Sequence, residues 1–257
     1  MDAATLARAM GCSLARAQEM RAPMNNAMLA AGCTTVNRAA MWCAQIGTES
    51  AGLVYMAEIA DGSEYNGRAD LGNTQLGDGP RYKGSGPIQL TGRANFRAFS
   101  QWCFSKGWVL TPRYLEDLPD LVRTDPHWGF LAASWYWTVA RPQINSLSDA
   151  GDLDAVTRAI NGGLNGIDDR RARWNRCRAL GAAILPTGGF LMALTDAQQD
   201  QLLADVRYIK EQIGPKLPAW SADSSLGTND KGEELTLRDG FAAFKRTVEA
   251  LAKKLGA

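Results

Sequence analysis

Apolar residues recur at helical spacing through most of the first 185 positions. The pattern predicts helices over 2–10, 24–31, 37–48, 93–106, 126–139, 152–161 and 168–184. In the third of these segments the small and apolar side chains share one side, and Asn37 is the expected N-cap. The chain is therefore predicted to be mainly α-helical, with minimal β structure.

The stretch from 61 to 87 breaks this pattern, because it is rich in Gly, Asp and Asn and has no helical period. A loop of this length inside a compact domain is uncommon and usually functional. It leads into a short segment where Gln89 and Thr91 alternate with the apolar Ile88 and Leu90. A polar pair on an extended, glycine-braced segment suits hydrogen bonding to the hydroxyl and acetamido groups of a sugar. The competing interpretation is a Gly-rich turn beside a short strand.

The sequence changes character after residue 187, which divides the chain into a main domain, 1–187, and a tail, 188–257. TDAQ at 195–198 and TLRD at 236–239 resemble capping boxes, and each precedes a short apolar stripe. The segment 214–234 is rich in Pro, Gly, Ser and charge, as in a linker. Helices this short are marginal in isolation. The tail is therefore expected to pack on the main domain, to attach to a cell wall or to form a homo-oligomer.

Composition excludes several classes of protein. The net charge of +1 gives no basic surplus for binding nucleic acid. The five cysteines lack CxxC spacing, which predicts buried free thiols. The first 20 residues alternate charged and apolar positions, so no signal peptide is expected and synthesis in a cytoplasm follows. No stretch approaches the roughly 20 apolar residues of a membrane span, which predicts no membrane insertion.

Acidic residues offer the most plausible chemistry. Cleaving a glycosidic bond without a cofactor needs a carboxylic acid and usually a second carboxylate. Glu49 ends a predicted apolar helix, where its charge opposes the helix dipole, so a stabilising role is disfavoured. Glu58 can share a site with it only if the helix breaks between them, and Gly52 offers the place. Glu64 is the competing base, and the loop also holds Asp61, Asp70 and Asp78.

Other chemistries fit the sequence less well. His127 is the only histidine, and no GxSxG motif accompanies it, which disfavours a serine triad. A zinc site normally needs several His or Cys ligands at suitable spacing. NGGLNG at 161–166 lacks the GK[ST] of a phosphate-binding loop. We therefore expect neither a metal nor a cofactor.

Three motifs together resemble a known family. GTES at 47–50, the run YNGRADLGNTQLGDGPRYKGSGPIQLTGRANF at 65–96 and AINGGLNGIDDR at 159–170 resemble the signature regions of family 19 glycoside hydrolases, in their bacteriophage endolysin branch. The resemblance covers about residues 20 to 185, in the right order. It implies a lysozyme-like, two-lobed helical fold, shared with plant-type chitinases, and an inverting mechanism.

The resemblance also implies roles for single residues. Glu49 matches the general acid, Glu58 matches the water-activating base, and Thr91 resembles the hydroxyl residue that helps to hold the water. Arg170 is expected to orient a catalytic carboxylate. The residues expected on the substrate-binding side are Gln89, Asn95, Asn161, Tyr82 and Arg170.

The sequence departs from the family pattern at two positions. Ser85 stands where the family usually has an arginine, and Thr48 stands where plant chitinases have a histidine. The second difference favours the phage branch. The expected function is hydrolysis of the β-1,4 bonds of peptidoglycan glycan strands for host lysis, after holin-dependent export from the host cytoplasm. The alternatives are a chitinase and a noncatalytic wall-binding module.

Overall fold

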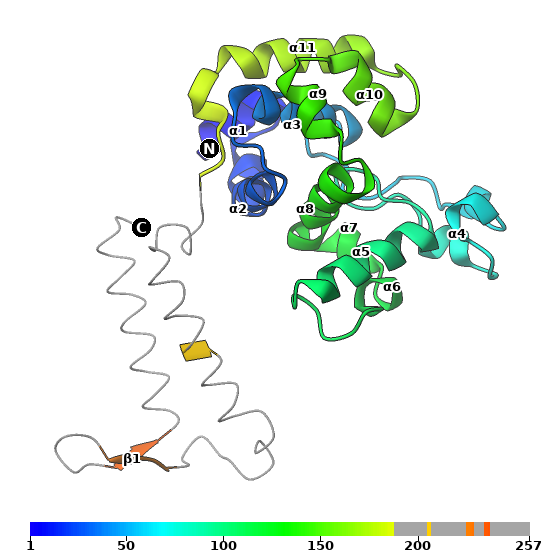
Figure 1. The fold of residues 1–257 in the computed structure, drawn as a ribbon, viewed down its shortest axis with the longest axis vertical. Helices are drawn as coiled ribbons and strands as arrows, with labels where there is room; N and C mark the ends of the chain where they lie inside the picture. The colour runs from blue at the N-terminus through cyan, green and yellow to red at the C-terminus, as the bar shows by residue number, and fades with distance from the viewer. Residues whose placement is uncertain (188–204, 207–224, 229–233, 237–257) are drawn as a thin grey trace. The chain divides into compact units, whose positions relative to one another are not determined.

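The computed structural model describes residues 1–187, 205–206, 225–228 and 234–236 (Figure 1). The chain divides into two compact units, Met1–Thr187 and Gly188–Ala257. In the second unit the strands β1 (Ser225–Thr228) and β2 (Glu234–Thr236) pair antiparallel. The strand β1 lies within the segment 214–234, for which the sequence predicts a linker. Apart from residues 205–206, which are helical, both predicted tail helices lie outside the described residues.

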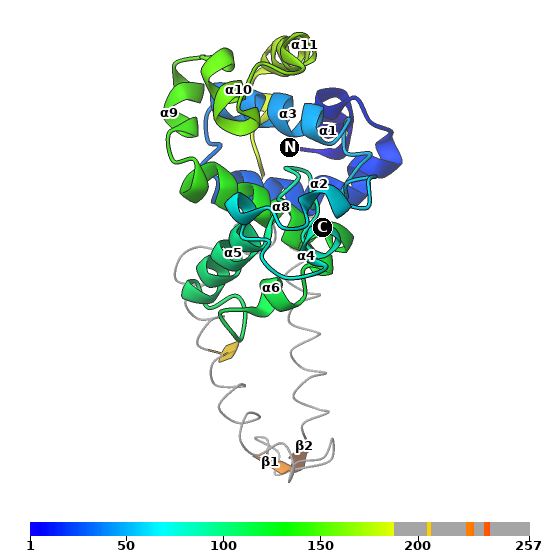
Figure 2. The same ribbon diagram turned by 90° about the vertical axis from the view of Figure 1, so that its right-hand side faces the viewer.

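The first unit is mainly helical, as predicted. One group of helices is built around α3 and α11, which pack closely together and are joined there by α1 and α9 (Figure 2). A π-helix, η3, follows α8 directly. The elements of the first unit, in chain order, are α1 (Ala3–Met10), α2 (Leu14–Ala30), α3 (Val36–Glu49), η1 (Ser63–Tyr65), η2 (Ala69–Leu71), α4 (Asp78–Arg81), α5 (Arg93–Ser105), α6 (Tyr114–Asp117), α7 (Asp120–Thr124), α8 (Pro126–Trp135), η3 (Tyr136–Ala140), α9 (Ile144–Asp149), α10 (Leu153–Asn161), α11 (Ile167–Ala179) and η4 (Gly181–Ile184).

Some boundaries differ from the predicted ones. The helix predicted at 24–31 begins at Leu14, because Ser13 caps it by accepting a hydrogen bond from the Arg16 amide at 3.2 Å. Thr35, rather than Asn37, caps α3, with its hydroxyl accepting from the amide three residues on. The helices α6, α7 and α9 are four to six residues long, too short to show a hydrophobic period.

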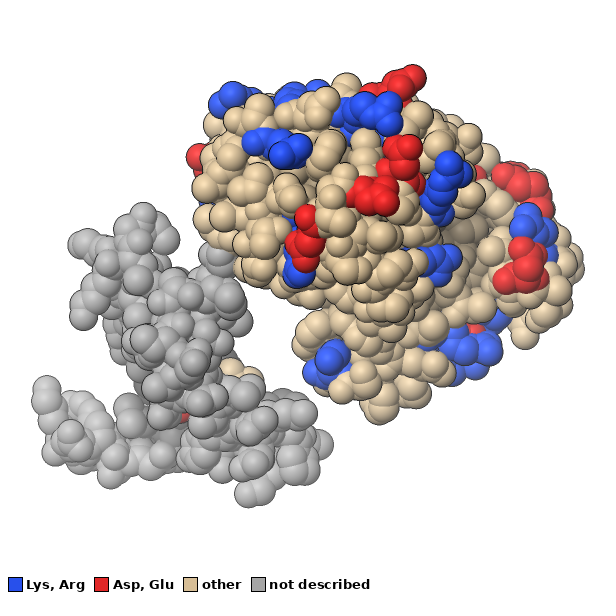
Figure 3. Space-filling model, turned by 45° about the horizontal axis from the view of Figure 1, so that its top comes forward, with Lys and Arg blue, Asp and Glu red and all other residues tan. Residues whose placement is uncertain are grey.

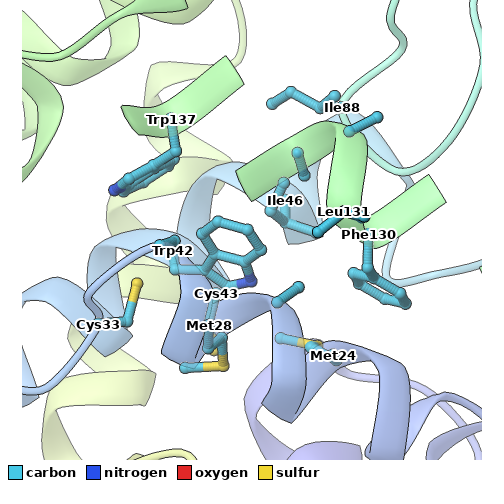
Figure 4. Close-up of a cluster of buried hydrophobic side chains, with 14 of the residues drawn as sticks. Met24, Met28, Cys33, Trp42, Cys43, Ile46, Ile88, Phe130, Leu131 and Trp137 are labelled. Carbon is cyan, nitrogen blue, oxygen red and sulfur yellow. The ribbon is translucent and has the colours of Figure 1, made fainter. Parts of the chain in front are cut away.

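The core lies where α2, α3 and α8 meet (Figure 4). Trp42 and Trp137 are both fully buried, with their ring centroids 5.1 Å apart. Met24, Met28 and Phe130 belong to the same buried cluster, in which flexible methionine side chains fill irregular space between large rings. This packing fixes the position of α3, whose last residue is Glu49. All five cysteines are free of disulfides and four of them are buried, as predicted.

Charged side chains of both signs are interspersed on the face of the first unit shown in Figure 3. In the described ranges, none of the helices combines the length and the hydrophobicity needed to span a bilayer. Likewise, no three His, Cys, Asp or Glu side chains of the described residues are grouped so that they could hold a metal ion.

Candidate active site

Glu49 is the last residue of α3, and its carboxylate forms an ion pair with Arg170 of α11. The Arg170 side chain is only 2% exposed, whereas that of Glu49 is 17% exposed. The same guanidinium donates to the side-chain oxygen of Gln45 and to the carbonyl of Asn165, the latter at 3.2 Å. Charge-assisted hydrogen bonds of this kind hold a carboxylate in one orientation. Arg170 therefore orients Glu49 from the buried side of the carboxylate. Because Arg170 itself is buried, it does not reach a substrate.

Thr48 ties the same end of α3 to α11. Its hydroxyl donates to the Asp169 carboxylate at 2.7 Å, and Arg173 donates to that carboxylate at 2.7 Å. Burial alone would raise the pKa of Asp169, but the hydrogen bonds from Arg173 and Thr48 outweigh it and hold the pKa below its ordinary value. Thr48 thus has a structural role in this chain, because its hydroxyl links the end of α3 to α11.

A left-handed turn follows Glu49 at once. Ala51, Gly52 and Leu53 have φ angles of 50°, 74° and 68°. A Cβ on Gly52 would lie 2.7 Å from the carbonyl oxygen of Met10, so only glycine fits there. The helix does break between Glu49 and Glu58, as a shared site requires: α3 ends at Glu49, and Gly52 lies in the turn that follows. The turn sends the chain toward the Gly-rich loop, and so toward Glu58.

Glu58 is half-buried, and both of its carboxylate oxygens accept hydrogen bonds. The Tyr65 hydroxyl donates to Oε1 at 2.9 Å and the Gly84 amide donates to Oε2 at 2.8 Å. The Glu58 amide in turn donates to the Gly84 carbonyl at 2.9 Å. Burial and the hydrogen bond to Glu58 raise the pKa of Tyr65 to about 12, so its hydroxyl remains a donor. Glu64, the competing base, lies exposed on η1.

Gly84 brings Glu58 and Gln89 together. A Cβ built on Gly84 would lie 2.6 Å from Oε1 of Gln89 and 3.0 Å from Oε2 of Glu58. Both side chains therefore pass over the same backbone position, and no side chain fits between them. The backbone of Gln89 has a φ of 57°, which is rare for a residue other than glycine and typical of functional sites.

The segment from Gly86 to Gln89 is a turn rather than a strand, and Leu90 directly after it forms an isolated antiparallel bridge with Ser85. Ile88 and Leu90 are buried, at 7% and 2% exposure, while Gln89 and Thr91 are half-buried. The predicted alternation of burial is thus confirmed, but the extended backbone is not. The reason is the left-handed residue 89, which closes a turn through the hydrogen bond from its amide to the Gly86 carbonyl at 3.1 Å.

The polar residues that follow are held by local hydrogen bonds. The Gln89 side chain donates to the Gly86 carbonyl at 3.0 Å, and the Thr91 hydroxyl donates to the Gln89 carbonyl at 2.8 Å. The Asn95 side chain, on the first turn of α5, donates to the Thr91 carbonyl at 2.7 Å. In each of these three side chains the donor group bonds to a backbone carbonyl, so the side-chain oxygen remains available to accept a hydrogen bond from a ligand.

Asn161 is the last residue of α10 and is exposed. Its side-chain oxygen accepts from the Asn165 amide group at 3.0 Å, and the Asn165 carbonyl accepts from Arg170. Asn161 is thereby connected to the Glu49 pair through two hydrogen bonds. The candidate residues fall into two groups, one around Glu49 and one around Glu58, joined by the turn at 51–53.

Tyr82 does not fit its predicted place in the substrate site. It is fully buried, its hydroxyl donates to the Glu116 carbonyl at 3.1 Å, and its ring packs on Phe96 with the centroids 5.3 Å apart. The Arg93 guanidinium covers the ring, 4.8 Å from its centroid. Tyr82 is therefore a core residue beneath the Gly-rich loop, because its large ring finds an apolar site there.

Buried ion pairs anchor that loop to α5 and α6. Glu116 is fully buried and accepts hydrogen bonds from Arg97 at 2.9 and 3.0 Å and from Arg93 at 3.2 Å. Asp78, 2% exposed, pairs with Arg93 at 2.5 Å. Hydrogen bonds from Arg97, then Arg93, lower the pKa of Glu116 despite its burial, and Arg93 lowers that of Asp78. This network fixes the entry to α5, on which Asn95 lies.

Two tyrosines at the site were not predicted from the sequence. Tyr65 stands in the motif YNGR, seven residues after Glu58, and nothing in the spacing marks it as a partner. Tyr136 is half-buried between the buried Trp135 and Trp137, and its hydroxyl donates to the carbonyl of Ile160, the residue before Asn161, at 3.3 Å. In each case the hydroxyl group is the only sequence feature that could indicate a polar contact, since a buried Tyr usually finds a hydrogen-bond partner.

Comparisons with known proteins identify relatives of both units. A family model described as chitinase class I matches residues 5–152, and one described as the Rv3766 C-terminal domain matches residues 194–251. A Haemophilus influenzae protein described as glycosyl hydrolase family 19 domain-containing is 31% identical over 172 residues, covering 54% of this chain and 78% of that protein.

Two further relatives complete the comparison. The uncharacterized protein Rv3766 of Mycobacterium tuberculosis is 42% identical over 74 residues, which cover 28% of this chain and 26% of that protein. The crystal structure of chitinase C from Streptomyces griseus HUT6037 superposes with a TM-score of 0.53 at 22% identity, covering 73% of this chain and 77% of that one. At this level of identity the structure supports the fold alone.

Proposed function

Since this chain belongs to glycoside hydrolase family 19, an inverting glycosidase family, we propose that it cleaves the β-1,4 bonds of bacterial peptidoglycan. The observation that carries the proposal is the separate anchoring of two glutamates. Arg170 orients Glu49, whereas Tyr65 and Gly84 orient Glu58. An inverting glycosidase needs two such carboxyl groups with different tasks.

In the proposed reaction Glu49 protonates the leaving oxygen and Glu58 activates a water molecule on the opposite face of the sugar ring. Glu58 accepts a hydrogen bond at each of its two oxygens, and each oxygen has a lone pair left for the water. Thr91 donates its proton to the Gln89 carbonyl, so its hydroxyl oxygen can accept a hydrogen bond from that water. Gln89, Asn95 and Asn161 are the proposed sugar contacts.

Peptidoglycan is proposed as the substrate because Thr48 stands where the family resemblance gives plant chitinases a histidine, a difference that favours the phage branch. The experiment is digestion of purified peptidoglycan, followed by mass spectrometry of the released muropeptides. New reducing ends are expected with the unaltered chain and none with Glu49→Gln. The identity of the reducing-end sugar shows which of the two glycosidic bonds is cut. Reducing ends from chitin alone would refute the choice of substrate.

Chitin is the second candidate, since the matching family model is named for chitinases and a Streptomyces chitinase shares the fold. The same digestion with chitin in place of peptidoglycan separates the two. A noncatalytic wall-binding module is the third candidate, and retention on peptidoglycan without any new reducing ends would support it.

A role in host lysis follows if peptidoglycan is the substrate. We propose that the chain reaches the wall through a holin-type pore, and that the tail attaches to the wall or forms a homo-oligomer. Expression in a bacterium with and without a holin tests the first point, since lysis is expected only with the holin. Mass measurement with and without residues 188–257 tests oligomerisation.

A further inference from the structure

Tyr136 is the first residue of the π-helix η3, Arg141 directly follows its last residue, and the two side chains stack on each other. The Arg141 amide donates to the Tyr136 carbonyl at 2.9 Å, and its guanidinium lies 5.1 Å from the centroid of the Tyr136 ring. In an α-helix, residues five apart are turned by about 140° from a common face. The wider π turn brings them back over one another, and such turns are frequent at functional sites. The π-helix therefore creates this stacked pair.

The pair binds the carboxyl end of α10. The Tyr136 hydroxyl donates to the Ile160 carbonyl at 3.3 Å, and Nε of Arg141 donates to the Ala159 carbonyl at 3.0 Å. The last carbonyls of a helix have no partner within it. The left-handed Gly162 satisfies the carbonyl before these two, with its amide at 2.9 Å. Three successive carbonyls at the end of α10 thus have partners, and two of the partners come from η3 and the residue after it.

The next residue is Asn161, the proposed sugar contact. It accepts a hydrogen bond from Asn165, whose carbonyl accepts one from Arg170, the partner of Glu49. The loop 161–166 is therefore fixed at one end by the stacked pair and at the other by Arg170. Burial raises the pKa of Tyr136, Arg141 opposes this rise and the charge of Glu49 adds to it, so the pair also lies within electrostatic reach of the proposed acid.

We propose that Tyr136 and Arg141 are positioning residues for Asn161, the proposed sugar contact at the end of α10. They hold the end of α10, and hence the side chain of Asn161, at a fixed place relative to Glu49. The inference deepens the proposed function and rests on it. It also predicts a specific kinetic signature, because a residue that places a sugar contact alters substrate binding more than the chemical step.

The test is Tyr136→Phe in the full chain, assayed on the polymer from which the unaltered chain releases reducing ends. Loss of one neutral hydrogen bond predicts a rise in KM of about two- to tenfold, with kcat changed less than about twofold. In a chain that already carries Asn161→Ala, Tyr136→Phe is expected to raise KM no further, since its effect acts through Asn161. The control Tyr114→Phe, at a half-buried tyrosine of α6, leaves KM unchanged.

Arg141→Gln is the second variant, and it is expected to show the same KM rise and the same dependence on Asn161. Its control is Arg171→Gln, because Arg171 is exposed and its ion pairs among the described residues are with exposed carboxylates, Asp154 at 3.1 Å and Asp168 at 3.7 Å. An unchanged KM in both variants, or effects that multiply with Asn161→Ala, would overturn the inference. Failure of the proposed function has a different signature, which is undiminished hydrolysis by Glu49→Gln.

Discussion

Replacement of Glu116 by Gln tests whether the buried ion network beneath the Gly-rich loop stabilises the fold. The carboxylate is fully buried and accepts hydrogen bonds from Arg97 at 2.9 and 3.0 Å and from Arg93 at 3.2 Å. Glutamine has nearly the same shape, but one carboxylate oxygen is replaced by an NH2 group. That NH2 group is a donor and cannot accept hydrogen bonds from the guanidinium N–H groups. Two arginine charges would then lack their buried partner.

Removing one partner of a buried ion pair costs about 3–5 kcal/mol of unfolding free energy. For a unit of this size that corresponds to a fall in Tm of about 6–20 °C. Urea denaturation of the full chain, followed by tryptophan fluorescence, measures it, since seven of the eight tryptophans lie before residue 188. The matched control is Asp117→Asn. Asp117 is 54% exposed and pairs with Arg113 at 3.0 Å, so the expected loss is below about 1 kcal/mol.

The pH dependence gives a second, independent check. Because the pKa of Glu116 in the folded state lies below its ordinary value, its contribution to stability is complete above that ordinary value, about 4.3. The contribution is lost as the pH falls through the lowered pKa. The stability gap between the unaltered chain and Glu116→Gln is therefore expected to be constant from pH 5 to 7 and to shrink below about pH 4. A loss under about 1 kcal/mol at pH 7, or a gap that widens in acid, would refute the reasoning.

Three further predictions concern the site. Glu49→Gln should abolish release of reducing ends while circular dichroism stays unchanged, and near-normal hydrolysis would sink its assignment as the acid. Glu58→Gln should be severely impaired and Glu64→Gln, at an exposed position, close to normal in the same assay. Gly52→Ala should destabilise the chain more than Gly67→Ala in urea denaturation, because both have φ above 70° but only Gly52 meets a backbone oxygen at 2.7 Å. Equal losses would mean that the clash with Met10 does not matter.

The hydrophobic period and the order of the motifs predict the fold class and most long helices. The reason is that apolar residues at helical spacing mark the face that each helix buries. The helix break between Glu49 and Glu58 is predictable once both are assigned to one site, since glutamates nine residues apart cannot share a face of one helix. The partners of the carboxylates are not predictable. Arg170 lies 121 residues from Glu49, and Tyr65 reaches Glu58 only because the loop folds back.

The same limit explains the misplacement of Tyr82. A tyrosine at the edge of a polar, glycine-rich loop has the composition of a sugar contact, but its exposure is set by tertiary packing. The burial of its ring depends on Phe96, on the next helix, and on the Arg93 guanidinium above it. No local pattern encodes such contacts.

The left-handed turn at Ala51, Gly52 and Leu53 makes the connection between the two glutamates rigid rather than hinge-like. Two non-glycine residues hold a positive φ there, Leu53 is fully buried, and its carbonyl accepts from Arg16 at 2.8 Å. Lengthening or shortening residues 50–57 by one would change the direction in which the chain leaves α3. The longer stretch 61–77 carries no such constraint on Glu49. Natural variation in length should therefore be rarer between the two acids than in the loop beyond Tyr65, whose hydroxyl holds Glu58.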